Sequence, residues 1–254
     1  MRILLTNDDG IFAPGLLAMH KTLATFADVD VVAPASVQSG GSHAITIRNP
    51  VLWNPVNVND HFQGTAVEGT PADCVKLAIH ALLDRKPDLV VSGINAGLNT
   101  GVHVIYSGTV AAAIEAGILD CPAVAVSLAI YRDMDFDRAA ALTKRIIDPL
   151  LEHGLQPGQV VNISIPEFKP GWPKGVRIAP QSTRPMIEEL EKRSDPNGRE
   201  YYWLSGDYTA LNDKTDTDRM ALHEGYVCVT PLQFNLTDTA RLADMRDWKW
   251  PDLS

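Results

Sequence analysis

The sequence predicts an α/β protein with a Rossmann-like, three-layer core built on a mostly parallel sheet. Apolar strand-like segments alternate with helical patterns through its first half, which is typical of βαβ units. Two predicted strands, residues 88–92 and 122–127, are almost continuously apolar, as expected of strands covered on both faces. The first strand, Met1–Thr6, ends at Asn7-Asp-Asp-Gly10, so two adjacent carboxylates follow it directly.

The predicted elements of the first half follow one another in chain order. After the first strand we expect a helix over 15–27 and a strand over 29–33. The segments between 44 and 64 alternate and contain Pro and Asn, so they suggest an extended excursion or hairpin beside the core. A helix then begins at Thr70-Pro-Ala-Asp73, because a threonine cap, a proline in the first turn and an aspartate all favour a helix start.

The second half closes the core and adds an extension. A helix over 136–152 and a strand over 160–165 complete the predicted Rossmann-like unit, which we place at residues 1–165. Prolines and a glycine between 166 and 173 then break the chain. Residues 166–254 form a carboxyl-terminal extension of the same unit, expected to contain strands, a hairpin and a helix.

The extension contains two strand candidates, 199–204 and 225–230, and a helix candidate over 237–248. Aromatic strands and an amphipathic tail beside a complete core need a surface to pack against. That surface belongs either to a neighbouring subunit or to the chain's own core, and we favour the neighbour.

Composition limits the classes of function. The chain has 254 residues, 45% of them apolar and 21% charged, with a net charge of -9 and a pI near 5.2. Duplex nucleic acid is an unsuitable partner, because its binding needs clustered basic residues. The amino terminus lacks the features of a signal peptide, and no apolar run approaches the roughly 20 residues of a membrane span, so we expect a cytoplasmic protein without a membrane partner. Three scattered cysteines form no zinc or disulfide pattern and are expected to be small buried residues: Cys74, Cys121 and Cys228.

Four polar clusters follow predicted strands, and a doubly wound topology brings such loops to one edge of the sheet. Asp8 and Asp9 would repel each other there unless a cation lay between them. The Ser36–Ser42 cluster offers hydroxyls and glycines, and Asn95 follows a buried strand within a loop rich in glycine and asparagine. Each cluster alone also fits an ordinary turn or glycine loop. Together they favour a site for a hard divalent cation.

The fourth cluster, Tyr106-Ser-Gly-Thr-Val110, begins a predicted helix. Free amide groups and the positive end of the helix dipole make such a start suitable for phosphate. Ser107 or Thr109 as an ordinary helix cap is the competing interpretation, and the two are compatible. Oxygen ligands beside a phosphate-binding helix start are typical of metal-assisted phosphoryl transfer to water.

Absent motifs narrow the class further. The first loop is not GxGxxG, no GxxxxGK[ST] is present, and neither a GxSxG elbow nor an HExxH pattern occurs. A nicotinamide enzyme and a P-loop NTPase are therefore unsuitable interpretations. His43 and His103 lie near the predicted site in the sequence, where either would contact substrate or supply a proton, but we favour ordinary satisfied histidines.

The chain resembles the SurE survival protein family of metal-dependent 5′-nucleotidases and phosphatases, and the resemblance covers nearly all of it. The region 183–213 is less recognisable, so substrate preference stays open. The motifs that carry the resemblance are Asn7-Asp-Asp-Gly10, Ser39-Gly40 with Ser42, Gly69–Val75, Ser92–Asn95 with Gly97, Asn99 and Gly101, Tyr106–Val110, Asp216-Thr-Asp218 with Ala221, and Gly225–Val227 with Thr230–Leu232.

The resemblance implies specific roles and an assembly. It implies a Rossmann-like core whose carboxyl-terminal hairpin and helix exchange between subunits, giving a homodimer or homotetramer. It implies hydrolysis of nucleoside 5′-monophosphates, with 3′-monophosphates and polyphosphate as further candidate substrates, and with Asp8 and Asp9 as the catalytic residues. It implies one divalent ion per subunit, Mg²⁺ or Mn²⁺, held by Asp8, Asp9, Ser39 and Asn95. The residues implied around the phosphate are Asn99, Ser107, Gly108 and Thr109.

Two alternative functions stay open from the sequence. A haloacid-dehalogenase-type phosphatase uses an aspartyl nucleophile in a DxD arrangement, whereas Asp8 and Asp9 are adjacent. A phosphate-responsive receiver-like module also places an acid pair after its first strand, but it needs a carboxylate where this chain has Asn95, and it needs only about half the length.

Overall fold

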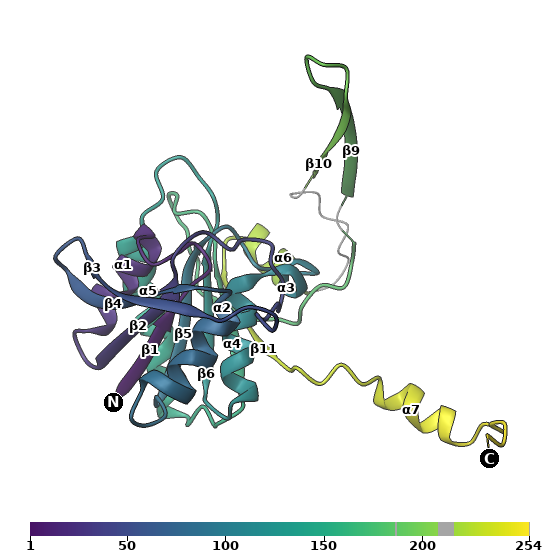
Figure 1. Cartoon of the computed structure of the whole chain (residues 1–254), viewed down its shortest axis with the longest axis horizontal. Helices are drawn as coiled ribbons and strands as arrows, with labels where there is room; N and C mark the ends of the chain where they lie inside the picture. The colour runs from purple at the N-terminus through teal and green to yellow at the C-terminus, as the bar shows by residue number, and fades with distance from the viewer. Residues whose placement is uncertain (186, 208–215, 254) are drawn as a thin grey trace.

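The computed structural model describes residues 1–185, 187–207 and 216–253, and its centre is a nine-stranded sheet (Figure 1). The strand order is β3-β4-β2-β1-β5-β6-β7-β11-β8. Strands β4, β2, β1, β5, β6 and β7 are parallel, while β3 pairs antiparallel with β4, and β11 pairs antiparallel with β7. The strand bounds are β1 Arg2–Thr6, β2 Asp28–Pro34, β3 Leu52–Val58, β4 Phe62–Glu68, β5 Leu89–Ala96, β6 Ala123–Leu128, β7 Val160–Ile165, β8 Val176–Ile178 and β11 Val227–Leu232.

Helices cover both faces of this sheet. Helices α1 and α5 pack on each other and on one face, over a core that includes Leu5, Leu16 and Ile147. Helices α2 and α4 pack on each other and on the opposite face, over a second core that includes Leu4 and Val110. The predicted three-layer, Rossmann-like α/β architecture is therefore confirmed. The helix bounds are α1 Pro14–Leu23, α2 Pro71–Leu77, α3 His103–Tyr106, α4 Gly108–Ile118, α5 Phe136–Glu152, α6 Asp218–His223 and α7 Thr239–Arg246.

The start of α2 shows how local sequence fixes an element. The Thr70 hydroxyl accepts a hydrogen bond from the Asp73 amide at 3.1 Å, and the Asp73 carboxylate accepts one from the Thr70 amide at 2.9 Å. This reciprocal capping box satisfies two amides that the first turn would leave unpaired. The helix predicted to begin at Thr70 is present, but it changes at Ala78 to a π-helical turn over Ala78–Leu82.

The sheet continues beyond the strand predicted to close it. β11 pairs antiparallel with β7, and β8 pairs parallel with β11. Segments of the carboxyl-terminal extension thus extend the sheet of the core, and the division at residue 165 stays a prediction. The excursion expected between 44 and 64 contains β3, which forms a hairpin with β4, and β4 joins the sheet beside β2.

Two segments project from the body of the molecule (Figure 1). The predicted carboxyl-terminal hairpin is present as β9 (Ile187–Ser194) and β10 (Glu200–Asp207), which pair only with each other among the described strands. Helix α7 has no buried residue. Exchange of these segments between subunits stays a prediction. Among the described residues, no helix combines the length and apolar character that a membrane crossing requires.

Gly15 sets how closely α1 approaches the sheet. A Cβ atom at this position would lie 2.0 Å from the carbonyl oxygen of Ile94 and 3.2 Å from the Phe136 ring. The contact with Ile94 is to backbone, which cannot move aside as a flexible side chain would. A glycine is therefore required where α1 meets the end of β5, immediately before Asn95.

We expect Gly15→Ala to destabilise the protein by about 1–3 kcal/mol, because the added methyl group must push α1 away from β5. Urea unfolding followed by circular dichroism measures this change. Lys21→Ala, on the exposed side of the same helix, is the control, since it changes no residue that faces the sheet. Equal stability of the two variants would contradict the close-packing argument.

Candidate functional site

Asp8 lies in the loop that follows β1, and its carboxylate is held at the start of α4. Its Oδ1 accepts a hydrogen bond from the Thr109 hydroxyl, and only 3% of the residue is exposed. A Cβ atom on Gly108 would lie 2.9 Å from Asp8 Cβ, so no larger residue fits at that position without displacing one of the two. Two of the predicted polar clusters, Asn7–Gly10 and Tyr106–Val110, therefore meet at Asp8.

Asp9 joins the Asn7–Gly10 loop to the segment that contains Asn95. It is half-buried, and its Oδ2 accepts a hydrogen bond at 3.1 Å from the amide of Ala96, the last residue of β5. The turn interpretation of this loop is also correct, because the Asn7 side chain exchanges two hydrogen bonds with the backbone of Gly10, at 2.9 and 3.2 Å. The loop is thus a stable turn that also presents two carboxylates.

Burial disfavours the charged form of both acids. It raises the pKa of the Asp8 carboxyl above its ordinary value, against the opposing effects of the Thr109 hydroxyl and of backbone amides at the start of α4. It also raises the pKa of Asp9, where the Ala96 amide opposes the shift and the neighbouring Asp8 charge adds to it. Within the described residues neither carboxylate forms an ion pair. The pair therefore has an uncompensated negative charge that suits a cation.

Asn95 and Ser39 are the other two predicted ligands, and their surroundings differ. Asn95 is 9% exposed, and its Nδ2 donates to the Gly97 carbonyl at 2.7 Å, which leaves Oδ1 as its candidate ligand atom. Ser39 lies in an exposed turn after β2. The residue before it, Gln38, donates its amide to the carbonyl oxygen of Asp8 at 2.8 Å. The second cluster is thereby attached to the first through the backbone.

The predicted ligand atoms suit a hard cation. Two carboxylates, an amide oxygen and a hydroxyl are the kinds of oxygen ligand that Mg²⁺ and Mn²⁺ accept. No group of three or more His, Cys, Asp or Glu side chains with metal-binding geometry occurs among the described residues, so a site with more acids is not an alternative there. Hydrogen bonds bring three of the four loops directly onto Asp8 and Asp9, and the donor set fits the cation.

The predicted phosphate residues at the start of α4 already have partners within the protein. The Ser107 hydroxyl accepts a hydrogen bond from the Val110 amide at 3.1 Å, so Ser107 is the helix cap. Thr109 is fully buried and donates to Asp8. Its hydroxyl therefore positions an acid in this structure, and a direct contact with phosphate stays a prediction for Ser107, Gly108 and Thr109.

Asn99 presents an unused donor. The backbone amide of Asn99 donates to the Ser127 hydroxyl at 3.3 Å, and its backbone carbonyl accepts from the Asn162 side chain at 2.8 Å. These two bonds fix the backbone of Asn99 over β6 and β7. Its side-chain Nδ2 is buried and has no hydrogen-bond partner among the described residues. A buried donor without a partner is costly, and an anionic ligand is one way to satisfy it.

Asp218 is a positioning residue to which the sequence analysis gave no role. It is 1% exposed, and its carboxylate accepts hydrogen bonds from the amides of Gly101 at 2.8 Å and Ser182 at 3.0 Å. Gly101 ends the loop that carries Asn99, so α6 holds this loop against the sheet. The Asp216-Thr-Asp218 motif was part of the family resemblance, but the long-range contact to Gly101 is not readable from the sequence.

A second buried acid, Glu115 on α4, is fully paired. Its carboxylate lies 2.6 Å from Lys76 Nζ and 2.8 Å from His43 Nε2. Burial raises the pKa of Glu115, and the two pairing groups lower it by more, so the net shift is downward. His43 is thus a satisfied histidine, as favoured from the sequence. The ring of His103 contacts the Tyr106 ring edge-on, with centroids 6.3 Å apart.

Comparison with known proteins identifies the family. The model of the family described as "Survival protein SurE" matches residues 3–188. A 5′-nucleotidase SurE of Christiangramia forsetii is 45% identical over 253 residues, covering 98% of this chain and 97% of that protein. A protein of the same name from Syntrophobacter fumaroxidans is 42% identical over 248 residues, covering 98% and 99%. The crystal structure of the SurE protein from Aquifex aeolicus superposes with a TM-score of 0.85 at 35% identity, covering 97% of this chain and 98% of that one. The chain belongs to the SurE survival protein family.

Proposed function

We propose that this protein is a metal-dependent phosphomonoesterase that hydrolyses nucleoside 5′-monophosphates to nucleoside and phosphate. The observation that carries the proposal is the meeting of the four loops at Asp8, which is buried, and Asp9, which is half-buried, both without an ion-pair partner among the described residues. The relatives' name, 5′-nucleotidase SurE, supports the choice of substrate class. Nucleoside 3′-monophosphates and polyphosphate are further substrates within the proposal.

One divalent ion per subunit, Mg²⁺ or Mn²⁺, is part of the proposal. Asp8 and Asp9 would hold it with their carboxylates, Asn95 with Oδ1 and Ser39 with its hydroxyl, and the oxygen-rich character of this set supports the assignment. A bound divalent ion supplies Lewis-acid chemistry, since it neutralises negative charge on the phosphate.

The chain's own residues would perform the remaining tasks. Asn99 Nδ2, the buried donor without a partner, would hold a non-bridging phosphate oxygen. The start of α4 at Ser107 and Gly108 would contribute the positive end of the helix dipole, and Ser107 would contribute its hydroxyl group. Asp9 is the more exposed of the two acids, while Asp8 is engaged by Thr109. We therefore assign to Asp9 the acceptance of a proton from the attacking water.

The two alternative functions are less well supported by this geometry. A haloacid-dehalogenase mechanism needs an exposed aspartyl nucleophile, whereas Asp8 is buried and hydrogen-bonded to Thr109. A receiver-like module needs a carboxylate near the end of β5, where Asn95 carries an amide that cannot form an acyl phosphate. Intact-mass measurement after incubation with a phosphoryl donor separates the receiver-like module from simple hydrolysis, because a stable phosphorylated protein contradicts our proposal.

A homodimer or homotetramer in the cytoplasm is also part of the proposal. The β9–β10 hairpin exposes Tyr202, Trp203 and Leu204, and α7 has no buried residue. A cleft of about 800 Å³, lined largely by apolar residues from α3, α4 and the segment after β11, offers a complementary surface. Unpaired cysteines at all three positions support a reducing compartment.

We expect phosphate release from AMP to require a divalent ion. EDTA in excess should abolish it, Mn²⁺ or Mg²⁺ should restore it, and Asp9→Ala should reduce kcat by about 100-fold or more because a ligand and proton acceptor is lost. Asp28→Ala, which changes an exposed acid at the start of β2 and therefore at the opposite edge of the sheet, should retain normal activity. Activity that survives complete chelation, or that persists in Asp9→Ala, would exclude the proposed mechanism.

A panel of substrates tests which phosphate compounds the protein prefers. The wild-type protein is assayed with 5′-AMP, 3′-AMP, 5′-monophosphates of the other bases and short polyphosphate, each with Mg²⁺ and with Mn²⁺. We expect hydrolysis of 5′-monophosphates at the highest kcat/KM. A preference for polyphosphate over every nucleotide would contradict the assignment as a nucleotidase.

The raised pKa values of Asp8 and Asp9 predict a pH-dependent effect of metal on stability. Without metal, a carboxyl whose folded-state pKa lies above its ordinary value of 3.8 keeps its proton in the folded protein at pH values where the unfolded chain has lost it. The stability of the metal-free protein therefore falls as the pH rises from the ordinary pKa to the folded-state pKa. A bound cation replaces these protons. The increase in melting temperature with Mn²⁺ should therefore be larger at about pH 8 than at about pH 5, as measured by calorimetry.

Asp9→Asn tests the origin of this effect, because the amide keeps the shape of the side chain and cannot titrate. The variant should show a smaller increase in melting temperature with Mn²⁺ and a weaker dependence of that increase on pH. An identical increase at both pH values in the wild-type protein would show that these carboxyls do not bind the ion.

A further inference from the structure

A cleft of about 390 Å³ lies beside Asn99, outside the predicted metal and phosphate residues. Leu98 and Thr100, the two neighbours of Asn99, line one side of it. Trp172, from the segment after β7, and His223, from the end of α6, are among the residues that line the remainder. The cleft therefore extends from the two residues that flank a predicted phosphate contact to an aromatic ring.

The position of Asn99 joins this cleft to the candidate site. Its backbone is hydrogen-bonded to Ser127 of β6 and Asn162 of β7. The segment that contains Trp172 follows β7, so it leaves the sheet at the same carboxyl-terminal edge as the Asp8–Asp9 loop. A ligand whose phosphate lies at Asn99 would extend along this edge toward Trp172.

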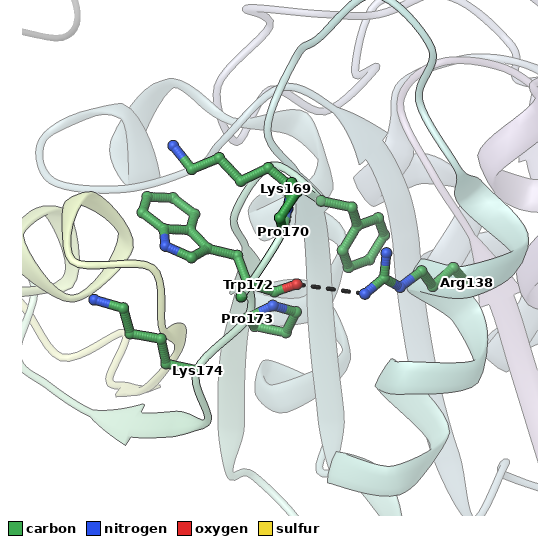
Figure 2. A pocket seen from close by; sticks show the side chains of 8 residues that line it. Arg138, Lys169, Pro170, Trp172, Pro173 and Lys174 are labelled. Carbon is green, nitrogen blue, oxygen red and sulfur yellow. Dashed lines mark hydrogen bonds between the residues drawn. The ribbon is translucent and has the colours of Figure 1, made fainter.

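The indole of Trp172 contacts the backbone of Gly225 and the ammonium group of Lys169. A Cβ on Gly225 would lie 2.2 Å from Trp172 Cε2, so the backbone of Gly225 packs closely against the indole. The ammonium group of Lys169 lies 3.7 Å from the indole centroid (Figure 2). Lys169 is exposed, and its flexible side chain is able to leave the ring. An aromatic ligand would then find a flat, rigidly supported surface.

Neighbouring contacts hold the segment of Trp172 in place. The Arg138 guanidinium donates to the Trp172 carbonyl at 3.3 Å and lies over the Phe168 ring, 4.2 Å from its centroid (Figure 2). The backbone of Trp172 is thus fixed to α5, while the indole points away from Arg138 toward α6. Such support is what a stacking surface requires, because an ordered ring loses little conformational freedom on binding.

We propose that this cleft binds the nucleoside part of the substrate, with its base stacked on Trp172 in place of the Lys169 ammonium. The inference rests on the proposed function for the phosphate end of the ligand, and it adds a base-binding residue to it. Every nucleobase has a π-face, so stacking accepts all four bases and favours the larger purines. Thr100 and His223 supply polar groups at the rim for the sugar hydroxyls and the edge of the base.

Adenosine is the probe that separates this inference from the proposed hydrolysis, because it carries the base without a phosphate and needs no metal. Calorimetric titration should show that Trp172→Leu weakens adenosine binding by about tenfold and Trp172→Phe by less, since phenylalanine retains a stacking face. Lys169→Ala, which uncovers the indole, should bind adenosine at least as tightly as the wild type. Trp53→Leu, in β3, is the matched control and should be unchanged.

The kinetic comparison uses AMP and ribose 5-phosphate, which share the phosphate and sugar. Trp172→Leu should raise KM for AMP about tenfold and leave KM for ribose 5-phosphate unchanged, with normal melting curves confirming that the variant is folded. Equal effects on the two substrates, or adenosine binding that is lost in Lys169→Ala as strongly as in Trp172→Leu, would overturn the inference. Failure of the wild-type protein to hydrolyse either substrate, with adenosine binding intact, would overturn the proposed function alone.

Discussion

The placement of the site depends on one buried interaction, the hydrogen bond from the Thr109 hydroxyl to the Asp8 carboxylate. It ties the end of β1 to the start of α4, and the absence of a side chain at Gly108 allows that approach. The backbone of Asp8 also receives the amide of Gln38, and its neighbour Asp9 receives the amide of Ala96. An acid that the chain leaves without a countercharge is thereby held by three surrounding loops, which favours a ligand that brings positive charge.

Much of the fold could be predicted because it depends on local patterns. The helix over 136–152 and the strand over 160–165 have the predicted bounds, and the capping box at Thr70 starts α2 as its sequence indicates. The pairing of β11 with β7 and β8 was missed, because it joins segments far apart in the sequence and leaves no local periodicity. The helix after the first strand ends at Leu23 rather than at 27, since no breaker marks its end.

Part of the candidate site could likewise be predicted from the sequence, and part depends on contacts between distant segments. The strand-to-loop rule located Asp8, Asp9 and Asn95 at one edge of the sheet, because it needs only the strand ends and the topology. The contribution of Asp218 to the Asn99 loop, and the position of Trp172 beside that loop, both require tertiary contacts between distant segments. Thr109 was expected to face phosphate, and only the packed structure shows that its hydroxyl is engaged by an acid.

The central claim is that Asp8, Asp9, Asn95 and Ser39 surround one cation. A crystal structure of the protein grown with Mn²⁺, with diffraction data collected at the manganese absorption edge, tests it most directly. The account predicts one anomalous peak per subunit with carboxylate oxygens of Asp8 and Asp9, Asn95 Oδ1 and the Ser39 hydroxyl at about 2.0–2.6 Å. An anomalous peak elsewhere, or a fully occupied site that these side chains do not approach, would contradict it.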